Sequence, residues 1–201
     1  MNTKKKTDWG CIFGLLMVVL MIAAGIWAII RNFQEKSAAK VFDSMSTQNL
    51  TTCGRCLTQV ASGYFPIIMS SSVENYTEFI PYSPYVRGKV LVVGTTTGIA
   101  IGATMLDLSP EIAATNPDEV NTLVCAGEVE QWNSTTYSDN QPGYTLIREI
   151  CVYDLTMDNI IFAAELWGSR PPATKTQSGP ASGSDPARKS LIDILEWLPR
   201  K

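Results

Sequence analysis

The longest apolar segment of the chain extends from Trp9 to Ile30 and contains no Asp, Glu, Lys, Arg, Asn or Gln. Its 22 residues would form a helix about 33 Å long, which matches a bilayer hydrocarbon core of about 30 Å. The segment is apolar on all sides, which argues against a helix that buries one face in a soluble core. The pattern therefore predicts a transmembrane helix over residues 9–30, preceded by a cytoplasmic tail of residues 1–8.

A cleaved signal peptide is the alternative interpretation of this segment. The apolar region of a signal peptide is usually about 7–15 residues long and is followed by small residues, and residues 37–39 (Ser-Ala-Ala) would suit cleavage. The segment here is longer, and Trp9 and Trp27 lie near its two ends, where indole rings prefer the membrane interface. We therefore favour an uncleaved anchor.

The charges beside the segment leave its orientation nearly balanced. Lysines at positions 4–6 precede it, opposed by Asp8, and three basic residues follow it: Arg31, Lys36 and Lys40. A free amino terminus and the cysteine usage described below favour an N-terminus in the cytoplasm. We therefore expect a single-pass membrane protein whose main domain lies outside the cytoplasm.

Residues 31–46 are expected to form either a stalk helix or a linker. Apolar side chains recur near helical spacing in this stretch, at Phe33, Ala38, Val41, Phe42 and Met45. The spacing predicts that the anchor helix continues as a partly amphipathic stalk, which could pack on the domain or on a partner. A solvated linker with chance periodicity is the alternative, and the sequence does not choose between them.

Residues 47–201 show strand patterns separated by turn-rich stretches. Continuous or alternating apolar runs predict five strands, over residues 87–94, 99–106, 123–132, 144–155 and 160–167. We expect the first two to form an antiparallel hairpin around a turn at residues 95–98, and the last two to form another hairpin. The polar residues 133–143 should be a loop. The predicted fold class is α+β, with an antiparallel sheet of about five strands in one extracytoplasmic domain.

Three proline-containing segments predict helices. At residues 109–110 (Ser-Pro) and 116–117 (Asn-Pro) a capping residue precedes proline at the first helical position, so we interpret the nearby carboxylates as helix caps rather than an acid/base pair. Residues 185–186 (Asp-Pro) begin a C-terminal helix, and the apolar face that should dock on the sheet consists of Leu191, Ile194, Leu195 and Leu198. Before it, residues 168–185 are rich in Pro, Gly, Ser and Thr and should form a flexible loop.

Composition removes many classes of chemistry. The 201 residues carry a formal net charge of -3, which argues against nucleic-acid binding because that requires clustered Lys and Arg. The chain contains no histidine, which excludes Ser-His-Asp and Cys-His nucleophiles, the HExxH zinc site and His-ligated copper or iron. These patterns give no catalytic residues, cofactor or metal site, so enzymatic activity stays open and a non-enzymatic role is favoured.

Four of the five cysteines lie outside the apolar segment, at Cys53, Cys56, Cys125 and Cys151. An even number suits an oxidising compartment, so we expect two disulfides, for which three connectivities are possible. The Cys53-x-x-Cys56 pair is also the pattern of a redox dithiol, although the polar residues 47–52 lack the strand that precedes such a pair in the thioredoxin arrangement. A four-cysteine metal site is a further alternative, weakened because Cys125 and Cys151 do not form a second CxxC pair.

Two further patterns concern the surface of the domain. Aromatic residues among prolines could form a ligand-binding site, although such clusters more often serve packing: Tyr64, Phe65, Tyr82 and Tyr85. Three acceptor sequences for N-glycosylation begin at Asn49, Asn75 and Asn133, and they matter only in a source that glycosylates.

The patterns together favour a membrane-anchored module outside the cytoplasm. We expect it to bind or support another protein at the membrane surface, with the lipid bilayer as its second partner and with no nucleic acid or cofactor. The alternative is a membrane-tethered thiol-disulfide oxidoreductase that uses Cys53 and Cys56.

Overall fold

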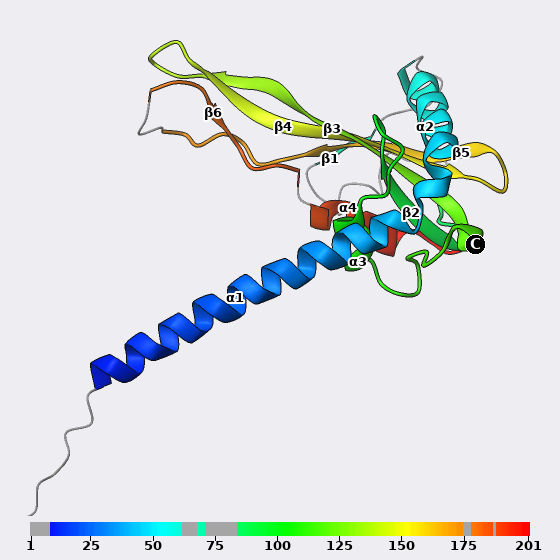
Figure 1. Cartoon of the computed structure of the whole chain (residues 1–201). Helices are drawn as coiled ribbons and strands as arrows, with labels where there is room; N and C mark the ends of the chain where they lie inside the picture. Colours follow the sequence, from blue (N-terminus) through cyan, green and yellow to red (C-terminus); the bar gives the residue numbers. More distant parts are fainter. Residues whose placement is uncertain (1–8, 62–67, 71–83, 175–177, 187) are drawn as a thin grey trace, which may run out of the picture.

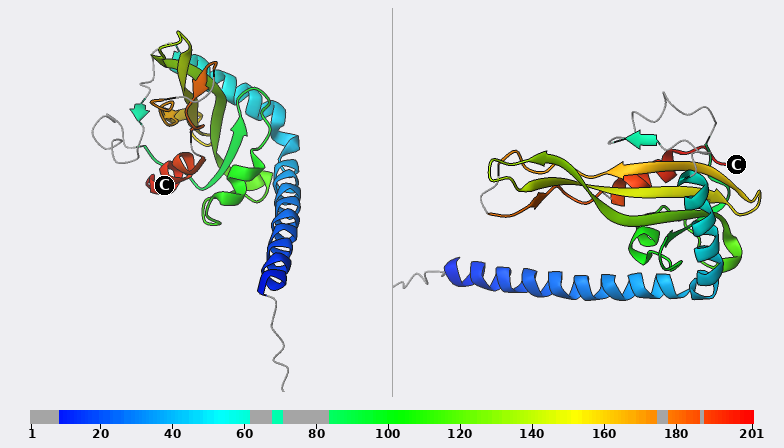
Figure 2. Two further views of the ribbon diagram at one scale, coloured as in Figure 1. Left: turned by 90° about the vertical axis from the view of Figure 1, so that its left-hand side faces the viewer. Right: turned by 90° about the horizontal axis from the view of Figure 1, so that it is seen from above.

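A six-stranded sheet with helices on both faces forms the body of the protein (Figure 1). The computed structural model describes residues 9–61, 68–70, 84–174, 178–186 and 188–201. Helix α2 (Ser46–Ala61) lies on one face of the sheet and helix α4 (Arg188–Trp197) on the other, while helix α1 (Trp9–Lys40) leaves the body (Figures 1 and 2). The mixed α+β class predicted from the sequence is confirmed.

Helix α1 begins at the predicted apolar segment and continues without a break to Lys40. Between Leu16 and Lys40 it is long and apolar enough to cross a membrane by length and composition, and its most apolar window is not buried in the protein. Figure 2 shows its N-terminal part projecting clear of the domain. Residues 31–40 are therefore helical, and a short 3₁₀ helix, Asp43–Met45, connects them to α2.

The C-terminal part of α1 packs against helix α3 (Gly102–Asp107). The two helices approach so closely at Gly102 that an added Cβ atom would overlap the backbone carbonyl oxygen of Glu35. Arg31 forms an ion pair with one carboxylate oxygen of Asp107, and Arg188 of α4 lies 2.7 Å from the other oxygen. Packing and charge thus join α1 to the body, and we call this contact the α1–α3 joint.

The strand order of the sheet is β1-β5-β4-β3-β2, and β6 pairs with β4 outside this path. The strands are β1 (Ile68–Ser70), β2 (Lys89–Gly94), β3 (Val120–Thr136), β4 (Pro142–Asp154), β5 (Asn159–Trp167) and β6 (Ala181–Ser182). Strands β3, β4 and β5 are antiparallel, whereas β2 pairs in parallel with β3, β1 with β5 and β6 with β4. The sheet is therefore mixed, and the expected antiparallel arrangement holds only for its three central strands.

The predicted hairpin over residues 87–106 is wrong in its second half. Strand β2 forms as expected, but residues 99–101 contribute only an isolated bridge between Ala100 and Val93 before α3 begins. The residues that become buried next are Thr104, Met105 and Leu108, which follow helical rather than alternate spacing. Because residues 95–119 then act as a crossover connection, β2 and β3 can pair in parallel.

Consecutive apolar residues of neighbouring strands form the core. Val90, Leu91, Val92 and Val93 are all 0% exposed, so this run of the predicted strand is buried on both faces of the sheet. Helix α4 and the residue after it contribute the four side chains expected of the C-terminal helix, and these also belong to the core: Leu191, Ile194, Leu195 and Leu198. The chain then returns to the start of β2, where the Val86 amide donates a 2.8 Å hydrogen bond to the Pro199 carbonyl.

Three predicted connections differ in the structure. Strands β3 and β4 extend into the loop predicted over residues 133–143, which leaves a short turn at residues 137–141. Residues 109–112 form a single turn instead of a helix, whereas Pro117–Glu119 is a 3₁₀ helix. The segment predicted as a flexible loop, residues 168–185, contributes β6 to the sheet within its described part.

Gly102→Ala should weaken the α1–α3 joint. The added methyl group has no space beside the Glu35 carbonyl, so we expect the free energy of unfolding to fall by about 1–3 kcal/mol, as in other overpacked sites. Gly54→Ala in α2 is the matched control, because nothing lies within 4 Å of its added Cβ, and it should be neutral or stabilising by up to about 1 kcal/mol. Chemical unfolding in detergent measures both, and equal effects would contradict the close approach.

Candidate functional site

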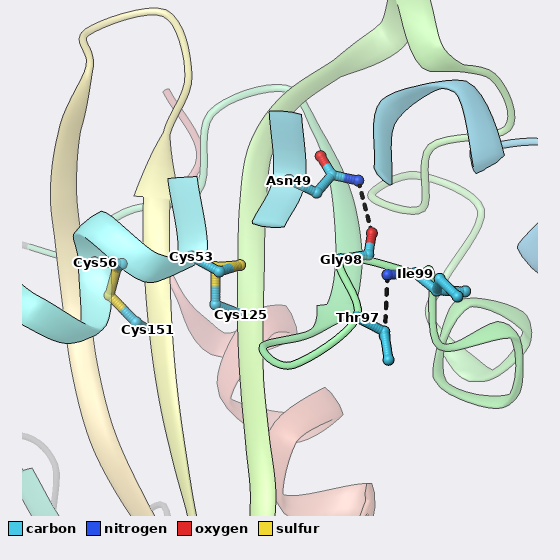
Figure 3. Close-up of a disulfide and its surroundings, with 8 residues drawn as sticks. All are labelled: Asn49, Cys53, Cys56, Thr97, Gly98, Ile99, Cys125 and Cys151. Atoms are coloured by element: carbon cyan, nitrogen blue, oxygen red, sulfur yellow. Dashed lines mark hydrogen bonds between the residues drawn. A yellow bond between two sulfur atoms is a disulfide. The ribbon is translucent and has the colours of Figure 1, made fainter. Parts of the chain in front are cut away.

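Helix α2 and two strands bring the four cysteines of the domain together. Cys53 and Cys56 are one helical turn apart and both are completely buried against the sheet, while Cys125 of β3 and Cys151 of β4 lie directly opposite each other in register. Cys53 pairs with Cys125 across a Cα–Cα distance of 5.5 Å, and Cys56 pairs with Cys151 across 6.3 Å (Figure 3). The disulfides therefore cross from the helix to two adjacent strands.

This pairing changes the meaning of the Cys53-x-x-Cys56 pattern. The two cysteines do not pair with each other, and Cys53 lies in the middle of α2, whereas a thioredoxin-type thiolate lies at a helix N-terminus. The four sulfur atoms form two disulfides, which leaves no thiolates for a metal ion. Within the described residues, no group of three His, Cys, Asp or Glu side chains is placed to hold a metal. The geometry supports a structural role for these cysteines.

Arg55, which lies between the two cysteines, connects α2 to the β4–β5 turn. Its guanidinium donates hydrogen bonds to the Tyr153 hydroxyl at 3.1 Å and to the Asp158 carboxylate at 2.9 Å, and Tyr153 in turn donates to Asp158 at 2.8 Å. Burial of Tyr153, together with its hydrogen bond to Asp158, raises the pKa of its phenol. Tyr153 is therefore neutral at physiological pH and acts as a packing and hydrogen-bonding group.

Asp154 is a completely buried carboxylate at the start of the same turn. Burial alone would raise its pKa, but hydrogen bonds from Arg87, the Met157 and Thr156 amides and the Tyr85 hydroxyl outweigh this effect and lower the pKa. All these donors stabilise the charged form. Asp154 thus closes the β4–β5 turn and fixes the start of β2, and it is not poised as a proton donor.

The carboxylates that the sequence suggested as helix caps behave as such around the 3₁₀ helix. The Asn116 side chain accepts a hydrogen bond from the Asp118 amide. The backbone amide and hydroxyl of Thr115 hydrogen-bond to Glu119 and lower the pKa of its carboxyl. These contacts use the carboxylate to satisfy local donors rather than to form an acid/base pair.

The predicted aromatic and glycosylation sites have mixed outcomes. Tyr85 donates its hydroxyl hydrogen bond to Asp154, and the Lys201 ammonium lies 4.0 Å from the centre of its ring, while Tyr64, Phe65 and Tyr82 lie outside the described residues. Asn49 is 1% exposed and donates to the Gly98 carbonyl at 3.2 Å (Figure 3), so a glycan cannot be accommodated there in the folded protein. Asn75 is likewise outside the described residues, and Asn133 is exposed on β3.

The most exposed regular structure of the domain is the far half of the β3–β4 hairpin, which we call the wing (residues 127–149 with the end of β5). Strand β2 accompanies β3 only as far as the Gly94–Ala126 pair, and beyond it the hairpin extends away from the body (Figure 2). Six of the residues that register and side-chain alternation place on the face of the wing that continues the cysteine face of the sheet are neighbours across β3, β4 and β5: Glu130, Trp132, Ile147, Glu149, Glu165 and Trp167. We call this set the outer wing face.

Aromatic rings and carboxylates alternate on the outer wing face. Trp132 is 56% exposed and contacts Trp167 edge to face, with ring centroids 6.3 Å apart. Glu149 lies opposite Glu165 in the strand register, and the indole N–H of Trp167 donates to Glu165 at 3.3 Å. Partial burial raises the pKa of Glu149, and the negative charges of Glu130 and Glu165 raise it further. This face therefore combines exposed aromatic surface with concentrated negative potential.

Sequence reasoning did not identify the outer wing face. Its residues come from three strands and meet only through the register of β3, β4 and β5, which no single stretch of sequence reveals. The alternation of Glu128 and Glu130 with Val129 was a usable strand signal. The polar composition of residues 133–143 nevertheless favoured a loop and ended the predicted strand too early.

The comparisons with known proteins give little guidance. No model of a protein family matches the chain, and no curated protein matches it. One similar solved structure is the crystal structure of protein XCC0632 from Xanthomonas campestris, assigned to the family DUF330. The similarity covers 67% of this chain and 91% of that chain, with 12% sequence identity and a TM-score of 0.30. A likeness this weak says nothing about what the chain does.

Tryptic digestion of the unreduced, thiol-blocked protein should reveal the crossed pairing, because cleavage after Arg55, Arg87 and Arg148 places the four cysteines in four separate peptides. We expect peptide 41–55 to be linked to 90–148, and peptide 56–87 to 149–175. Mass spectrometry distinguishes this result from a 41–55 to 56–87 linkage, which would restore the redox interpretation.

Replacing Cys53 and Cys125 together with serine should lower the free energy of unfolding by roughly 2–5 kcal/mol.

Glu149→Gln should stabilise the domain at neutral pH only. A raised pKa means that the folded state binds the proton more tightly than the unfolded chain, so charged Glu149 opposes folding and this opposition is lost as the pH falls through the raised pKa. We expect a higher Tm than wild type at about pH 7 and an equal Tm at about pH 3. Glu111→Gln, at an exposed carboxylate in another part of the domain, controls for the loss of one charge. An unchanged Tm at both pH values would refute the repulsion.

Proposed function

We propose that this chain is a single-pass, membrane-anchored domain outside the cytoplasm that binds another protein through the outer wing face, without catalysis. The observation that carries the proposal is the combination of the exposed Trp132 with three carboxylates that repel one another, Glu130, Glu149 and Glu165, on a wing clear of the body. An isolated domain gains no stability from such an arrangement.

The anchor and the compartment have independent support. The N-terminal apolar helix is compatible with a membrane anchor, and two disulfides suit an oxidising, extracytoplasmic space. The lysines at positions 4–6 are balanced by Arg31, Lys36 and Lys40, so the two disulfides carry the choice of the orientation with the N-terminus in the cytoplasm. In this orientation the whole sheet faces the extracytoplasmic side.

The chemistry of the outer wing face indicates the kind of partner. Tryptophan is enriched among the residues that contribute most to protein–protein binding, because a large flat ring excludes much water on contact. The surrounding carboxylates favour a partner that presents Lys or Arg side chains, since opposite charge speeds association and discriminates against acidic competitors. Binding of a cation would also relieve the repulsion around Glu149. We therefore expect a basic protein surface or segment.

Photo-crosslinking from adjacent positions on β3 tests this interface in cells. Trp132 and Gln131 are both exposed but point to opposite faces of the wing, so a benzoylphenylalanine at 132 should give a protein adduct that the same group at 131 does not. Glu165→Lys combined with the probe at 132 should abolish the adduct. Adducts of equal yield from both positions, or from neither, would contradict a binding role for this face.

Two measurements test the compartment and the absence of redox chemistry. A cysteine introduced at the exposed Met157 should react with a membrane-impermeant maleimide in intact cells, whereas the wild-type protein should not, because the domain is expected outside and its own four cysteines are buried and paired. Labelling of the introduced cysteine only after lysis would place the domain in the cytoplasm. Insulin reduction by the purified protein should proceed no faster than with the Cys53→Ser variant. A rate that depends on Cys53 would favour the oxidoreductase alternative instead.

A further inference from the structure

We propose that the tip of the β3–β4 hairpin, residues 137–141, rests on the surface of the lipid bilayer that α1 crosses. This inference depends on the membrane anchor of the proposed function, but it concerns the tip of the wing rather than the outer wing face. The protein would then contact the membrane at two points, through α1 and through the tip of the hairpin.

The body of the domain begins directly at the end of the membrane-spanning segment. Ile30 is the last residue of the apolar run, and Arg31, the next residue, already forms its ion pair with Asp107. Glu35, which packs on Gly102, is only about 6 Å further along the helix at about 1.5 Å per residue. Helix α3 therefore lies beside residues 31–35, at the level of the headgroups, and no stalk separates the body from the bilayer.

The wing extends over the membrane on the same side as the N-terminal part of α1. From Ala126, where β2 ends, to Thr136 the strand β3 covers about 33 Å at about 3.3 Å per residue. In the view from above in Figure 2, the hairpin and α1 run in the same direction from the body, and Figure 1 shows the hairpin inclined to α1. A wing that leaves the body at the membrane surface in this direction overhangs the bilayer beside the anchor.

The α1–α3 joint fixes the height of the tip. The close approach at Gly102 leaves no room for the body to slide along α1. Asp107 binds Arg31 and Arg188 at once, so it ties α1, α3 and α4 to one point. A swing of the body about α1 would break these contacts, and the orientation of the wing relative to the membrane is therefore set by the protein.

The chemistry of the tip suits a headgroup layer. Residues 133–143 contain one charged side chain, Asp139, and otherwise hydroxyl, amide, proline, glycine and tyrosine groups. Ser138, Asp139 and Asn140 are exposed. The Tyr137 hydroxyl donates a 2.6 Å hydrogen bond to the Pro172 carbonyl, and the Tyr137 amide donates to Gln141 at 2.9 Å, which holds the turn in shape. A preformed polar turn of this kind can hydrogen-bond to phosphate and ester oxygens without inserting into the hydrocarbon.

The experiment uses the full chain reconstituted in phosphatidylcholine vesicles, with a diazirine amino acid at one position at a time. Ser138 reports on the tip, and Met157, in the turn at the opposite end of β4, is the matched control; both are exposed. Ile22 of α1, also exposed, reports on insertion of the anchor. We expect lipid adducts by mass spectrometry from positions 22 and 138 and not from 157, and a several-fold loss of the adduct at 138, but not at 22, in Asp107→Asn.

The pattern of adducts distinguishes a failure of the tip contact from a failure of the membrane anchor. An adduct at position 22 with no excess at 138 over 157 would overturn the tip contact and leave the anchor intact. A missing adduct at position 22 would overturn the anchor itself, and the tip contact with it. An adduct at 138 that is unchanged in Asp107→Asn would show that the α1–α3 joint does not set the height of the tip.

Discussion

The arrangement of the molecule depends on the two crossed disulfides that bind α2 to the sheet. Over residues 46–59, where side-chain burial is described, the buried face of this helix offers little apolar surface, because Asn49, Thr52, Cys53 and Cys56 are the most buried side chains there. Burial of such a face contributes less than a Leu- or Ile-rich face would. The disulfides to β3 and β4 add stability to the contact between α2 and the sheet that burial of this face does not provide. They lie at the centre of the sheet, where Cys125 and Cys151 are register partners.

The disulfides also restrict the position of α1, because only residues 41–45 separate α2 from α1. Phe42 in this connection is 3% exposed and belongs to the core, so the chain is held on both sides of the bend between the helices. The α1–α3 joint then holds α1 from its other side. The domain is thus attached to α1 at three places close together, and these contacts fix the orientation of the sheet relative to α1.

Much of this fold could be predicted from local sequence patterns, and the failures have physical causes. The apolar run, the buried Val90–Val93 strand and the C-terminal apolar face are local signals. Residues 99–106 were predicted to form a strand because their apolar side chains, such as Ile101 and Met105, suit a strand by composition. The helical spacing of Ile101, Met105 and Leu108 extends over a short stretch only, and helix α3 begins at a glycine, which is a weak helix signal. The role of Gly102 follows from the approach of Glu35, 67 positions earlier in the chain, which no local pattern contains.

The candidate site was harder to predict than the fold. The cysteines were recognised, but their pairing follows from which face of α2 meets which strand, and a CxxC pattern is compatible with every connectivity. The residues of the outer wing face are dispersed over β3, β4 and β5, and only the strand register brings Glu130, Glu149 and Glu165 close enough to interact. Polar strands that leave the core behave in sequence like loops, which is why the far end of the wing, residues 133–143, was predicted as a loop.

The outer edge of β3 has a consequence for how this protein avoids self-association. Beyond Ala126 the main-chain amides and carbonyls on the side away from β4 have no β2 neighbour, and an edge of this kind can template a further strand from another molecule. Two features oppose this: the register shifts between Ala126 and Val129 and between Asn133 and Thr135 twist the edge, and the exposed Glu128 and Glu130 repel an identical edge. The irregular backbone and the two carboxylates therefore oppose the joining of neighbouring copies of the chain into a continuous sheet.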